Sequence, residues 1–124
     1  MSDLLQKRLE EQQRAVVITE FTVPKSLCAD GGPKTIGMRA LTAEMELLAA
    51  KLGKHDYMRG QYNATKMAIV ELGGVRVKDR EDVDRFWEHA SPKLRTLLLK
   101  AYDRMSSPAA EEEDGFFASE TVKV

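Results

Sequence analysis

Residues 15–41 decide the fold, and their sequence is AVVITEFTVPKSLCADGGPKTIGMRAL. Residues 15–23 are rich in β-branched side chains, which favour a strand that ends at Pro24. Residues 24–34 contain two prolines and a Gly-Gly pair, which predict a turn or an exposed loop. Apolar and polar side chains then alternate through residues 35–41, and this period of two predicts a second strand. The pair predicts an antiparallel β-hairpin, which must pack on helices or on another chain because a lone hairpin is barely stable in water.

Residues 42–105 predict a helical body, because their apolar side chains recur at spacings of three and four. The expected helices begin near Thr42, Asp56, Arg80 and Ser91. The second helix is expected to run to Leu72 and to end at Gly73-Gly74, and residues 75–77 form an extended piece too brief for a firm strand. The side chains expected in the core include Leu48, Ile69, Trp87, Leu97 and Leu98.

These elements predict an α+β fold that is mostly α-helical, with an N-terminal β-hairpin packed on a small bundle of about four helices. At 124 residues the chain has the size of one domain. We place this domain at residues 1–105, with the hairpin region at 15–41 and the helical body at 42–105. Residues 3–14 favour only a short, weakly anchored helix.

Residues 106–124 form an acidic tail, with five acidic side chains against one lysine, while residues 1–105 carry 18 basic and 15 acidic side chains. The composition of the tail predicts disorder in the free protein, because it cannot bury enough apolar area to offset the entropy of ordering. Its charge either keeps the protein soluble, meets a basic partner or folds back on the body. The small positive charge of the body is too weak to indicate a nucleic-acid partner.

Composition also excludes several classes of protein. A single cysteine, Cys28, excludes a disulfide framework and a cysteine-based zinc site. No apolar run approaches the ~20 residues of a membrane span, and the N-terminus lacks the layout of a signal peptide. We therefore expect a cytoplasmic protein without a membrane partner.

No set of catalytic or metal-binding residues stands out. His55 and His89 lack the spacing that places two ligands on one helical face, so we interpret them as surface or capping residues. Cys28 lies in a polar loop without a group that would activate a thiol. The acidic cluster at residues 79–84 suits the first turn of a helix better than a divalent-metal site. We expect no enzyme activity, no cofactor and no metal.

The candidate partner-binding residues are Met45, Met58, Met67, Phe116 and Phe117. A methionine side chain repacks easily against irregular partners, although methionines on helical stripes also suit a core. The adjacent phenylalanines are either ordinary exposed aromatics or an anchor that docks in a groove.

The order of these segments resembles tail assembly chaperones of long-tailed bacteriophages. The resemblance covers residues 36–114 and depends on layout rather than on a diagnostic signature. The segments that carry it are Met38-Arg39-Ala40-Leu41-Thr42-Ala43-Glu44, Gly73-Gly74-Val75-Arg76-Val77, Ser91-Pro92-Lys93-Leu94-Arg95 and Ala101-Tyr102-Asp103-Arg104-Met105, followed by the acidic tail.

The resemblance implies a non-enzymatic protein that acts during virion assembly in the host cytoplasm and is absent from the mature virion. It also implies two partners, the long tape measure protein and the tail tube protein, and self-association is possible. Two other classes stay open from the residues alone. One is a small phage or bacterial adaptor or inhibitor that binds another protein, and the other is a small enzyme or DNA-binding regulator.

Overall fold

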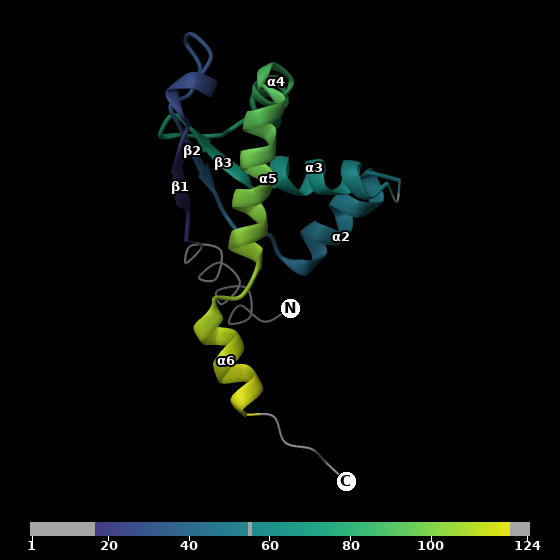
Figure 1. Ribbon diagram of the computed structural model, residues 1–124. Coiled ribbons are helices and arrows are strands. Elements are labelled where there is room, and N and C mark those ends of the chain that lie inside the picture. The colour runs from purple at the N-terminus through teal and green to yellow at the C-terminus, as the bar shows by residue number, and fades with distance from the viewer. Residues whose placement is uncertain (1–16, 55, 120–124) are drawn as a thin grey trace, which may run out of the picture.

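The computed structural model describes residues 17–54 and 56–119, which form a mixed structure of helices and one small antiparallel sheet (Figure 1). The strands, in sheet order, are β1 (Thr19–Thr22), β2 (Thr35–Met38), β3 (Ile69–Leu72) and β4 (Val75–Arg76). The helices are η1 (Lys25–Leu27), a 3₁₀ turn, and α2 (Ala43–Leu52), α3 (Tyr57–Ala68), α4 (Arg80–His89), α5 (Pro92–Ser106) and α6 (Ala110–Ala118). The expected helix at residues 3–14 lies outside the described residues.

The two N-terminal strands pair antiparallel, with Phe21 opposite Ile36, but both are shorter than the sequence predicts. They are also not a separate hairpin, because β2 lies between β1 and β3 in the sheet. Strand β2 thus pairs with β3 as well as with β1, so the two N-terminal strands are part of a larger sheet. The connection between β1 and β2 is closed by a 2.8 Å hydrogen bond from Val23 N to Lys34 O.

The prediction of a helix through Leu72 is wrong at its C-terminal end. Helix α3 ends at Ala68, and the next residue, Ile69, begins β3. Strand β3 turns into β4 through Gly73 and Gly74, whose φ angles of 63° and 80° suit a two-residue hairpin turn. The apolar run before these glycines therefore belongs to a strand, since pairing with β2 and β4 satisfies its backbone.

Side-chain caps start the helices at the predicted positions. Thr42 Oγ1 accepts from Met45 N at 3.3 Å, and Asp56 Oδ1 accepts from Arg59 N at 3.0 Å. Ser91 Oγ accepts from Leu94 N at 3.2 Å, and a proline follows it at the start of α5. Each cap satisfies a backbone donor that the first helical turn leaves open.

The core lies between the sheet and helices α3, α4 and α5 (Figure 1). Ile69, Trp87 and Leu98 are buried there, as predicted. The same prediction is wrong for Leu48 and Leu97, whose side chains are 49% and 42% exposed. The largest fully buried side chains are Ile36, Met38, Thr65, Ile69 and Val83.

The tail differs from the predicted disorder, because residues 110–118 form helix α6. Glu112 Oε1 accepts a 3.2 Å hydrogen bond from Ala109 N, and Glu111, Glu112 and Glu113 occupy the first turn, where the helix dipole favours acids. Every residue of α6 is exposed. The acidic run that suggested disorder thus also stabilises a helix N-terminus.

Candidate protein-binding surface

Helices α2 and α3 form an antiparallel pair at the end of the molecule away from the sheet (Figure 1). The turn between them includes Gly53, where a Cβ atom would lie 2.8 Å from the backbone nitrogen of Gly60. The side chain of Asn63 adds a 3.3 Å hydrogen bond from Nδ2 to the carbonyl oxygen of Ala49. A glycine at position 53 thus lets the two helices approach closely.

This helix pair carries a group of large apolar side chains that water reaches. Because α2 and α3 form a helical hairpin, distinct from the β-hairpin region, we call these side chains the hairpin surface: Leu47, Leu48, Leu52, Tyr57 and Met58. Leu52 ends α2 and Tyr57 begins α3, and they are 64% and 76% exposed. Single exposed apolar residues are ordinary, whereas an exposed apolar patch is typical of an interaction site, so this group is a candidate for one.

Of the three candidate methionines, the structure exposes only Met58, at 50%. Met45 is half-buried, and its Sδ atom lies 3.6 Å from the Arg39 Nη2 donor. Met67 is also half-buried and packs against the hydrophobic core. The methionines thus do not form one adaptable surface in this conformation.

The two candidate phenylalanines lie elsewhere. Phe116 and Phe117 are 72% and 63% exposed on α6, with their rings 5.3 Å apart in an edge-to-face arrangement. Figure 1 shows α6 beyond the end of α5, far from α3. The structure therefore separates the phenylalanine pair from Met58.

A second apolar surface lies between β1 and α5, and sequence reasoning missed it. It is a groove of about 290 Å³, which we call the α5–β1 groove. Its walls include Phe21, Val23, Leu94, Leu97, Leu98 and Ala101. The charged residues that line it are Lys100 and Arg104, both basic, and within the described residues neither forms an ion pair. The groove joins segments about 75 residues apart, so no local pattern could have indicated it.

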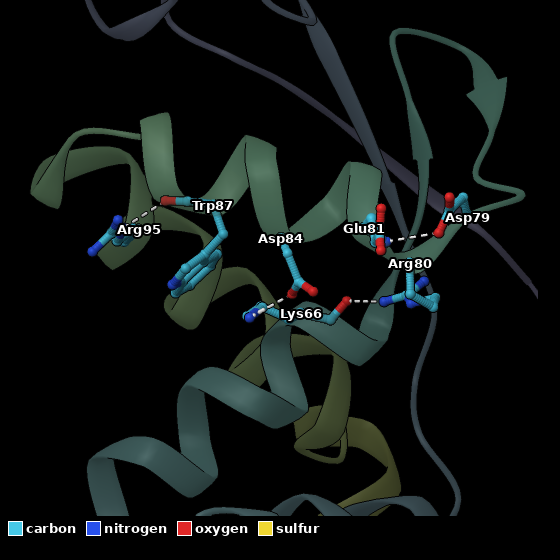
Figure 2. Close-up of polar contacts among 7 residues, drawn as sticks. All are labelled: Lys66, Asp79, Arg80, Glu81, Asp84, Trp87 and Arg95. Carbon is cyan, nitrogen blue, oxygen red and sulfur yellow. Dashed lines mark hydrogen bonds and ion pairs between the residues drawn. The ribbon is translucent and has the colours of Figure 1, made fainter.

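The acidic cluster at the start of α4 has structural partners (Figure 2). Asp79 Oδ1 accepts from Glu81 N at 3.0 Å and caps α4, while Asp84 Oδ1 lies 2.6 Å from Lys66 Nζ. Glu81 and Asp82 lie 3.9 and 3.6 Å from Arg85 Nη2. In the part of the chain that the structure describes, no three His, Cys, Asp or Glu side chains are grouped to hold a metal.

Arg80, next to this cluster, binds the end of α3 (Figure 2). Its guanidinium donates to the carbonyl oxygen of Lys66, as Figure 2 shows, and to that of Ile69 at 2.8 Å. Burial lowers the pKa of Arg80, while the nearby Asp84 opposes that shift. The cation thus satisfies carbonyls at the negative end of the α3 dipole.

The remaining candidates for chemistry occupy local positions. His89 ends α4, and its Nδ1 lies 2.8 Å from the carbonyl oxygen of Arg85. Cys28 is half-buried, with Sγ 3.6 Å from the carbonyl oxygens of Ala29 and Pro33. His55 lies outside the described residues. No described helix is long and apolar enough to cross a membrane.

In comparisons with known proteins, no family model, curated protein or solved structure matches this chain. A function must therefore be argued from its own residues.

Proposed function

We propose that this protein is a non-enzymatic tail assembly chaperone, which binds the tape measure protein in the host cytoplasm and helps to recruit tail tube subunits. The identity of the partners is inferred from the resemblance of this sequence to tail assembly chaperones. The binding surface comes from the side chains of the α2–α3 pair.

The observation that carries the proposal is the hairpin surface. Its leucines, tyrosine and methionine expose large apolar side chains on two consecutive helices. An amphipathic helix binds such a surface through apolar residues on one of its faces. Leu48 and Leu52 lie one turn apart on α2 and would contact successive turns of that partner.

Met58 suits a partner whose sequence varies along its length. Its flexible thioether repacks against different side chains at low cost, and half of it is open to water. A surface this small predicts modest affinity for each segment, about micromolar or weaker. Many copies on one long partner would strengthen the assembly through local concentration.

The test is co-expression with the candidate tape measure protein, followed by measurement of the soluble fraction and co-purification. We expect the wild-type chain to keep that protein soluble, and the double variant Leu48→Ser with Leu52→Ser to fail. The matched control is Val75→Ser, which removes a 69% exposed apolar side chain from β4 instead.

Equal performance of the double variant and the wild type would remove the hairpin surface from the mechanism. The wild-type chain could also fail to keep the tape measure protein soluble and bind tightly to an unrelated host protein. That result would contradict the chaperone function and favour an adaptor or inhibitor.

A further inference from the structure

We propose that helix α6 of one copy of this chain docks in the α5–β1 groove of a second copy. This interaction is independent of the hairpin surface and of the proposed function. It assigns an occupant to the groove and a binding role to the exposed phenylalanine pair.

The first argument is the chemistry of α6. Its exposed phenylalanine pair is preceded by four consecutive acids, Glu111 to Asp114. Glu113 lies three residues before Phe116 and four before Phe117, and Asp114 lies three before Phe117, so these acids share helical faces with the aromatic rings. The helix therefore offers an apolar end joined to an acidic end.

The groove presents the complementary chemistry on α5. Leu97, Lys100 and Arg104 follow one another at spacings of three and four, so they share one face of the helix. Leu97 is 42% exposed although its neighbour Leu98 is buried. This face thus changes from apolar to basic toward the C-terminus of α5.

These two patterns fix the direction of docking. When α6 lies antiparallel to α5, the phenylalanines meet Leu97 and the carboxylates meet Lys100 and Arg104. The parallel direction would instead place the aromatic rings beside the two cations and the acids beside the leucine. Apolar contact and charge pairing therefore both favour the antiparallel arrangement.

The linker between the two helices favours a groove on another copy. Ser107 and Ala109 have extended backbones, with φ and ψ of −90° and 139°, and −65° and 154°. Pro108 between them has a fixed φ and disfavours a helical conformation of Ser107. The linker directs α6 away from its own body (Figure 1). Exchange of such an element between copies is a low-cost route to association.

The experiment measures the molar mass of the full chain by sedimentation over a range of concentrations. We expect reversible self-association that weakens when the ionic strength rises from about 0.1 to about 1 M, because salt screens the charge pairs. The double variant Phe116→Ala with Phe117→Ala should weaken it about tenfold or more, as loss of buried aromatic anchors does. Both phenylalanines are exposed, so this variant keeps its fold.

Charge reversal then tests the register. The groove variant Lys100→Glu with Arg104→Glu and the tail variant Glu113→Lys with Asp114→Lys should each be monomeric. The tail variant leaves Glu112 in place, because its side chain caps α6. An equimolar mixture of the two should associate, because each tail then meets a groove of opposite charge. The control is Lys51→Glu with Lys78→Glu, which reverses two exposed lysines outside the groove and should associate like the wild type.

A wild-type chain that stays monomeric up to about 1 mM contradicts the proposal, even if α6 docks in its own groove. The proposal is also overturned if the phenylalanine double variant and the groove double variant self-associate as strongly as the wild type.

Discussion

The hydroxyl of Tyr102 on α5 donates a 2.7 Å hydrogen bond to Oε1 of Glu46 on α2. The two residues are 56 positions apart in the sequence, so the bond joins helices that are not consecutive. Tyr102 is otherwise buried, so its hydroxyl needs hydrogen-bond partners, and Ser106 is a second one.

Replacing Tyr102 by phenylalanine should lower the free energy of unfolding by about 1.5–3 kcal/mol, the usual contribution of a hydrogen bond to a charged group. Urea unfolding at neutral pH measures this difference. The control is Glu44→Gln on α2, the helix that carries Glu46. Glu44 is exposed, so this replacement should have little effect on stability.

The same residue predicts a pH dependence. Burial and the hydrogen bond to Glu46 raise the pKa of Tyr102 to about 12, from 10.0 for a free tyrosine. Because the pKa in the folded state is the higher one, the stabilisation is complete below pH 10 and is lost as the pH rises toward about 12. Unfolding curves across this range should converge for the wild type and Tyr102→Phe. A constant difference between them would contradict this assignment.

Gly53→Ala should destabilise the protein by about 1–3 kcal/mol, because the new methyl group would overlap the backbone of Gly60 and push α3 away from α2. Gly115→Ala is the matched control. A Cβ atom there meets nothing within 4 Å, and alanine favours a helix over glycine by about 0.5–1 kcal/mol. Thermal midpoints should fall for the first variant only.

Arg80→Met should cost about 1–3 kcal/mol, because the carbonyl oxygens of Lys66 and Ile69 lose their charged donor. Arg76→Met on β4 removes an exposed arginine of the same size and should be close to neutral. Chemical denaturation compares the two variants. Equal losses would show that Arg80 contributes only as a general surface charge.

Leu98→Asp should unfold the domain, because it would bury an unpaired carboxylate at a site that is 3% exposed. Leu97→Asp, one residue earlier and 42% exposed, should fold. Circular dichroism distinguishes the two outcomes. A folded Leu98→Asp variant with an unchanged thermal midpoint would refute the packing of α5.

The starts of the helices were predictable because their caps act over three residues. Thr42, Asp56 and Ser91 each bind a nearby backbone amide, and the sequence alone places them. Strand β3 was not predictable in this way. Its four residues, Ile-Val-Glu-Leu, extend an apolar stripe of α3, and only pairing with β2 and β4 makes them a strand.

Leu48 and Leu97 show a second limit of sequence patterns. Helical spacing identifies an apolar stripe but does not say which part of that stripe another element covers. The core prediction failed at both residues, and both now belong to candidate binding surfaces. Met58 and the phenylalanine pair were found by residue type, whereas the α5–β1 groove depends on tertiary contact.

The direct passage from α3 into β3 has a mechanical consequence. Ile69 N donates to Lys66 O in the helix, and Ile69 itself is paired with Met38 in the sheet. Ala68 O accepts a 2.9 Å hydrogen bond from Arg39 N, so the junction is held on both sides. The helix passes into the strand without a linker residue, although the pairing with β2 shifts register between Gly37 and Met38. Because no loop separates α3 from β3, a displacement of α3 would act directly on the strand that lies between β2 and β4.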